Sequence, residues 1–147
     1  VFDYFEEICA IPHGSRNTKA ISDYLVAFAK KHDLTWYQDE SNNVVIVQEA
    51  TAGYEQADTI ILQGHMDMVC EKESGCAIDF EKDGLDLYVD GDFLKARGTT
   101  LGGDDGIAVA YALAIMDSPE IAHPRLEVVI TVRRSECSVP RRLICLC

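Results

Sequence analysis

The chain has 147 residues, of which 48% are hydrophobic and 26% charged, a balance typical of a folded globular protein rather than a disordered one. Its formal net charge of −12 argues against a nucleic-acid-binding surface, because acidic side chains repel phosphate. No apolar run approaches the roughly 20 residues that a membrane span needs, so we expect neither a nucleic acid nor a membrane as a partner.

Two helices are predicted at the beginning of the sequence. Residues 2–9 place apolar side chains on one stripe, and a proline and a glycine then interrupt the helical pattern. A second helix is expected from a cap at Ser15 to about Lys31, again with apolar residues at helical spacing. We interpret His13 as a loop histidine and His32 as a surface histidine near the helix end, rather than as metal ligands.

Several short strands follow. Residues 35–38 and 44–48 are predicted as two strands joined by a polar turn. Between residues 77 and 96 the chain breaks into short alternating pieces around two Asp-Gly dipeptides, at 83–84 and 90–91, and both are hairpin signals. The acidic residues of this stretch lack the spacing and the closing glutamate of an EF-hand, so we expect solvated hairpins rather than a calcium site.

The first stretch with candidate chemistry is an apolar run that ends at Gly64. Residues 60–62 are predicted to form a buried strand, and His65 and Asp67 follow close to its carboxyl end. Open α/β sheets place their chemistry at this end of their strands. Because residues two apart share a face of an extended chain, the imidazole and the carboxylate are expected to project into the same cleft.

The second such stretch, residues 98–106, is a glycine-rich turn that contains Asp104 and Asp105 just before a predicted helix at 107–116. One aspartate would suffice as an N-cap, and two adjacent acids exceed that need. The stretch matches neither a Walker loop nor a GxGxxG fingerprint, and its acids would repel phosphate. We therefore reject phosphate binding here.

The fold class expected from this order is α/β, with a mixed β-sheet flanked by helices. A further buried strand is predicted at 126–132, with His123 in the loop before it. Residues 133–147 differ in character, since they carry four arginines against one glutamate and three of the six cysteines. We expect a domain over residues 1–132 and a disordered or poorly packed tail over 133–147.

Scattered cysteines and an N-terminus without a basic flank indicate reduced thiols and a cytoplasmic protein.

A histidine with nearby carboxylates is the usual donor set for zinc. His65 and Asp104 are far apart in the sequence, so such a site would be assembled by the fold. A bridging role between two ions about 3.5–4 Å apart would explain why an aspartate, Asp104, is held in a glycine turn at a helix N-terminus. Asp67 would fix the tautomer of the imidazole. Spacing alone does not distinguish a structural role for His65 from a catalytic one.

Three motifs together closely resemble the aminoacyl-histidine dipeptidases, cytosolic members of the co-catalytic zinc exopeptidase family. They are residues 11–17 (IPHGSRN), 64–69 (GHMDMV) and 98–106 (GTTLGGDDG). The resemblance spans residues 1–132. It implies hydrolysis of dipeptides of the Xaa-His type by a zinc-activated water, and a homodimer as the assembly.

The resemblance also implies roles for individual residues. His65 is expected to be a ligand of a two-zinc site, Asp104 the carboxylate that bridges the two ions, and Asp67 the catalytic carboxylate that steers His65. Cobalt or manganese would suit the same ligands.

The sequence departs from the family after residue 132. The family has an acidic Asp-Glu-Glu segment there, which supplies the general base and the next metal ligand, whereas this chain has Arg133, Arg134 and Ser135. Two cations would repel zinc and could not accept a proton. A shift of reading frame is our hypothesis for the tail.

The later ligands and the inserted lid and dimerisation domain are also missing from this sequence. We therefore expect the chain itself to be inactive or nearly so. The alternative is a non-catalytic product, either a truncated fragment or a weak metal-binding module.

Overall fold

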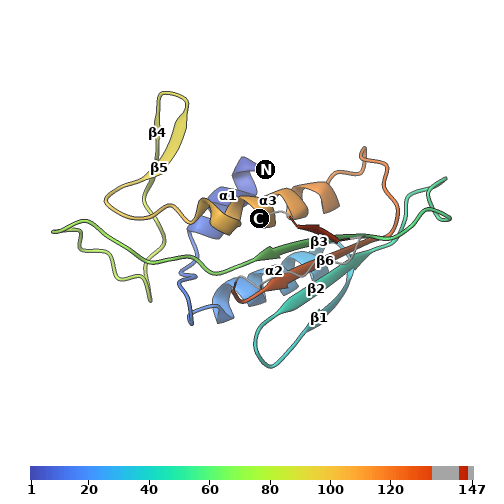
Figure 1. The fold of residues 1–147 in the computed structure, drawn as a ribbon, viewed down its shortest axis with the longest axis horizontal. Helices are drawn as coiled ribbons and strands as arrows, with labels where there is room; N and C mark the ends of the chain where they lie inside the picture. The colour runs from blue at the N-terminus through green and yellow to red at the C-terminus, as the bar shows by residue number, and fades with distance from the viewer. Residues whose placement is uncertain (134–142, 146–147) are drawn as a thin grey trace.

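Figure 1 shows the fold in a computed structural model, which describes residues 1–133 and 143–145. The described residues form three helices and seven strands. In chain order these are α1 (Phe2–Cys9), α2 (Lys19–Lys31), β1 (Thr35–Gln38), β2 (Val44–Gln48), β3 (Ile60–His65), β4 (Leu87–Asp90), β5 (Phe93–Ala96), α3 (Gly103–Met116), β6 (Leu126–Thr131) and β7 (Leu143–Cys145).

Five of the strands form one mixed sheet in the order β1-β2-β6-β3-β7. β1, β2 and β6 pair antiparallel, whereas β3 pairs parallel with both β6 and β7. The register sets Ile60 opposite Leu126 and His65 opposite Thr131, so the carboxyl ends of β3 and β6 lie at the same edge of the sheet. The predicted α/β class with a mixed sheet is confirmed.

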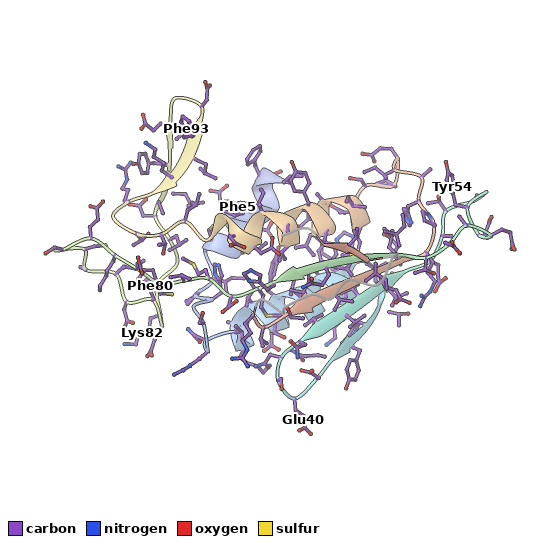
Figure 2. All side chains as sticks on the ribbon, in the orientation of Figure 1. Phe5, Glu40, Tyr54, Phe80, Lys82 and Phe93 are labelled. Atoms are coloured by element: carbon purple, nitrogen blue, oxygen red, sulfur yellow. The ribbon has the colours of Figure 1, made fainter. Side chains whose placement is uncertain are left out.

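The core lies between one face of the sheet and the helices. Residues of β6 alternate between buried and half-buried, and Val128 and Ile130 point into the core. Buried side chains of all three helices join the same core cluster, among them Phe5 of α1. Phe5 of α1 lies beside the start of α3 (Figure 2). A Cβ on Gly106 of α3 would be 3.1 Å from the Phe5 ring. The sheet is therefore flanked by helices, as predicted.

The predicted start of the second helix is wrong. α2 begins at Lys19 with Thr18 as its N-cap, and Ser15 lies outside the helix. His13 lies in the loop before α2, as predicted, but it is buried. His32 caps the C-terminus of α2, where its ring packs on Phe28, so it is half-buried rather than a free surface histidine.

One of the two predicted hairpins forms. β4 and β5 pair around residues 90–91, and Phe93 projects from this hairpin (Figure 2). The dipeptide at 83–84 is not a hairpin turn. Gly84 instead lies against the end of α1, where a Cβ would be 2.5 Å from the carbonyl oxygen of Ala10, and the backbone N–H of Leu85 donates to the carbonyl of Cys9 at 2.8 Å. Glycine is needed there for close approach of two backbones.

Within the expected disordered or poorly packed tail, residues 143–145 form β7, which pairs with β3 at the sheet edge. The rest of the expected tail, residues 134–142 and 146–147, lies outside the described residues. Within the part of the chain that the structure describes, no helix is both long and apolar enough to cross a membrane.

Candidate metal centre

His65 ends β3, and its side chain is only 8% exposed. Its backbone N–H donates to Oδ2 of Asp105 at 3.1 Å. A Cβ on the preceding residue, Gly64, would lie 2.8 Å from that same oxygen. The glycine before the histidine therefore leaves room for a carboxylate to hold the end of the strand.

Asp67 contacts one side of the imidazole. Nδ1 of His65 lies 3.1 Å from Oδ1 of Asp67 and 3.1 Å from the main-chain oxygen of Asp67. Both of these atoms are acceptors, so Nδ1 carries the proton. In a neutral imidazole the lone pair is then on Nε2, which is the tautomer that a metal ligand needs.

Asp104 contacts the other side of the imidazole. Its Oδ1 lies 3.2 Å from Nε2 of His65, and its side chain is 70% exposed. Two ligands that are each about 2.0–2.2 Å from one zinc ion at a near-tetrahedral angle lie roughly 3.2–3.6 Å apart. The observed separation therefore suits two ligands of one shared ion, with Asp104 on the solvent side.

The turn before α3 brings Asp104 to this position. Gly102 has φ +71°, a left-handed conformation that favours glycine, and a Cβ on it would be 3.0 Å from Sδ of Met68. Asp104 and Asp105 follow with non-helical backbone angles and are joined by a cis peptide bond. The N-cap of α3 is Gly102, and no side-chain cap hydrogen bond is made. The two acids therefore contact His65, one through its ring and one through its backbone.

Ser15 is a residue of this site that sequence reasoning missed. Its hydroxyl donates to Oδ2 of Asp67 at 2.6 Å, while Oδ1 of the same carboxylate faces His65. Its backbone N–H donates to the carbonyl of Met68 at 3.1 Å, which ties the loop before α2 to the segment after β3. A serine before a helical pattern predicts a helix cap, and no local signal in the sequence indicates a partner 52 residues away.

His13 contacts the same segment after β3 through its main chain. Its Nδ1 donates to the carbonyl of Ile11 at 2.6 Å, and its own carbonyl accepts from the N–H of Met68 at 3.1 Å. Burial lowers the pKa of His13, against the hydrogen bond to Ile11 and the charge of Asp67, which both raise it. The ring is therefore neutral at pH 7 and serves as a packed donor.

His65, Asp67 and Asp104 border a cleft of about 370 Å³. The side chains that line it are His65, Asp67, Met68, Val69, Asp104 and Arg133. Arg133 therefore reaches the cleft at the position where the resemblance led us to expect a carboxylate. Within the described residues, no group of three or more His, Cys, Asp or Glu side chains could hold a metal ion. The candidate donors that lie together are Nε2 of His65 and Oδ1 of Asp104, 3.2 Å apart, and the described part of the chain adds no third one.

Comparisons with known proteins agree with this fold. The chain is 41% identical over 132 residues to the cytosol non-specific dipeptidase of Escherichia coli (strain K12), a match that covers 90% of this chain and 27% of that protein. Its structure resembles that of the aminoacylhistidine dipeptidase from Vibrio alginolyticus, with a TM-score of 0.88 and 38% identity over 92% of this chain and 28% of that one.

Human carnosine dipeptidase 1 shares the fold at 13% identity and a TM-score of 0.57. No protein-family model matches the sequence. The chain spans about a quarter of the length of the Escherichia coli and Vibrio alginolyticus proteins. Over that stretch, the resemblance to the aminoacyl-histidine dipeptidases is confirmed in both sequence and fold.

Proposed function

We propose that this chain carries part of the catalytic site of a metal-dependent dipeptidase that hydrolyses dipeptides of the Xaa-His type. One observation supports this most: the imidazole of His65 lies between the carboxylates of Asp67 and Asp104, in a cleft at the carboxyl end of β3. The named relatives are dipeptidases, which supports a peptide as the substrate. The chain covers only about a quarter of the length of these relatives, so the activity of the whole protein is part of the proposal.

Each residue has a distinct part in this proposal. Nε2 of His65 and Oδ1 of Asp104 hold the ion, and Asp67 keeps the proton of the imidazole on Nδ1. Ser15 orients Asp67. Zinc is the ion we propose, with cobalt or manganese as substitutes, and when bound it polarises the scissile carbonyl and a water molecule.

We further propose that this chain by itself is inactive or nearly so. Arg133 lines the cleft, and a guanidinium there repels a divalent cation and cannot accept a proton from water. Two donors hold zinc weakly, since catalytic zinc sites use three protein ligands. This supports the second candidate as well, a weak metal-binding module without catalysis.

The cellular setting and the assembly are proposed by analogy only. One relative is named a cytosol protein, which supports a cytoplasmic location. A homodimer is the assembly that the resemblance implies.

Hydrolysis of an Xaa-His dipeptide in the presence of zinc tests the proposal of inactivity. We expect the wild-type chain and the His65→Ala variant to release histidine at the same background rate. A wild-type rate clearly above that of His65→Ala would overturn the proposed inactivity and support an enzyme that needs only these residues.

A further inference from the structure

A second cleft, of about 490 Å³, lies beside the candidate metal centre. It shares two lining residues, Asp67 and Arg133, with the cleft that His65 and Asp104 line (the metal cleft). The remaining lining comes from the loop before α2, the turn between β1 and β2 and the end of β6, through Ser15, Arg16, Thr18, Ser41, Asn42 and Val132.

The charge of this cleft differs from that of the rest of the molecule. The chain has a net charge of −12, yet two arginines and a single aspartate line the cleft. The metal cleft and three further clefts all have more aspartates and glutamates than arginines and lysines in their lining. A local excess of positive charge on an acidic protein attracts anions to that one place.

Both arginines are available to a ligand. Among the described residues, Arg97 pairs with Asp86 and Arg125 pairs with Glu49 and Glu127. Arg16 and Arg133 make no ion pair within the part of the chain that the structure describes. A guanidinium presents a planar fork of N–H donors that matches the oxygens of a carboxylate or a phosphate.

Asp67, the aspartate in the lining, makes no ion pair with either of these arginines among the described residues. One oxygen of Asp67 accepts the hydroxyl of Ser15, and the other faces Nδ1 of His65. The carboxylate is therefore held toward the metal cleft. Ser41 and Asn42 add a hydroxyl and an amide donor, and the N-terminus of α2 begins at the edge of the cleft with Thr18 as its N-cap.

We propose that this cleft binds a small oxyanion, a carboxylate or a phosphate group, held by the guanidinium groups of Arg16 and Arg133. Two sources share this chemistry: the terminal carboxylate of a short peptide, and free inorganic phosphate. The peptide source rests on the proposed dipeptidase function, whereas the phosphate source does not.

The test is an NMR titration of the full chain, labelled with ¹⁵N, stripped of metal over a chelating resin and kept in a buffer without carboxylate or phosphate. The three probes are glycyl-histidine, glycyl-histidine amide and inorganic phosphate. We expect saturable shifts at residues 15–18 and 41–42 with at least one oxyanion and none there with the amide. Binding of the peptide alone assigns the site to a peptide carboxylate, and binding of phosphate with equal or greater affinity assigns it to phosphate.

Variants decide whether the arginines are responsible. Arg16→Gln is expected to weaken binding roughly tenfold, because it removes the positive charge and the paired N–H donors of the guanidinium. Arg16→Lys is expected to weaken binding less, because it keeps the positive charge. Arg97→Gln is the matched control and is expected to bind as the wild-type chain does, since Arg97 lies outside this cleft.

Binding that is unchanged in Arg16→Gln, or no saturable shift with any oxyanion, would overturn the proposal. Because no metal is present, failure of the metal centre to bind zinc leaves this result intact.

Discussion

The imidazole of His65 is held on both sides, by a buried carboxylate on Nδ1 and an exposed one on Nε2. A buried carboxylate is costly unless donors satisfy it, and the hydroxyl of Ser15 supplies one for Asp67. Ser15, Asp67 and His65 therefore form a short chain of hydrogen bonds that ends at Nδ1 of the imidazole, whose other nitrogen, Nε2, is the proposed metal ligand.

Removal of this hydroxyl tests whether the chain of hydrogen bonds matters. Ser15→Ala is expected to weaken zinc binding by roughly threefold to tenfold, because loss of an outer partner of a ligating histidine costs affinity. Ser15→Thr keeps the hydroxyl and is expected to bind zinc as the wild-type chain does. Calorimetric titration measures both, with the melting temperature of each metal-free variant as a check on folding. Equal affinities for Ser15→Ala and the wild-type chain would refute the role.

His13 gives the fold a dependence on pH. Its pKa in the folded chain is lowered from 6.5 by burial, so below about pH 6.5 the unfolded chain binds more protons than the folded one. Stability supplied by neutral His13 is thus present above pH 6.5 and is lost as the pH falls through the folded pKa.

We expect the wild-type chain to lose more of its free energy of unfolding between pH 7 and pH 5 than His13→Gln does. Urea unfolding at both pH values measures this difference. The same loss in both proteins would show that His13 does not contribute to the dependence.

At the scale of elements, the parallel pair β3 and β6 sets the position of the site. Their carboxyl ends lie at one edge, and the start of α3 brings Asp104 to the same place. Val128 and Ile46 are fully buried in β6 and β2, so the strands behind the site have little freedom to shift.

Truncation of one such core residue is expected to destabilise the whole sheet. Ile46→Ala should lower the free energy of unfolding by about 2–5 kcal/mol, because it removes buried methyl groups and leaves a cavity. Val89 in the β4–β5 hairpin is 73% exposed, and Val89→Ala should change stability by less than about 0.5 kcal/mol. Denaturant unfolding compares the two, and similar losses would contradict this description of the core.

Local sequence patterns were sufficient to predict most of the helices and strands and part of the candidate site. The predicted helix at 2–9 and the strands at 35–38 and 44–48 have the observed bounds, because their apolar spacing is a property of adjacent residues. The two-residue spacing of His65 and Asp67 likewise predicted that their side chains meet.

The errors concern contacts between distant segments. A serine before a helical pattern and an Asp-Gly dipeptide both have a local meaning, as a cap and as a turn. In the folded chain Ser15 instead contacts Asp67, and Gly84 contacts Ala10. The parallel pairing of β3 with β6 is also non-local, and no periodicity in either strand specifies it.

At the scale of the whole molecule, charge is distributed unevenly around the site. The chain is strongly acidic, yet Arg133 lies at the edge where the metal cleft meets the second cleft. A cation in this place weakens the attraction of a divalent ion and strengthens that of an oxyanion. A domain boundary after Val132 and a shift of reading frame stay hypotheses, which the coding DNA beyond the codon for Val132 would decide.

The central claim is that His65 and Asp104 meet around one metal ion, and calorimetric titration with zinc tests it most directly. We expect the wild-type chain to bind a single zinc ion weakly, and His65→Ala and Asp104→Ala each to abolish that binding. Two tight sites in the wild-type chain, or a zinc affinity that both variants retain, would contradict the claim.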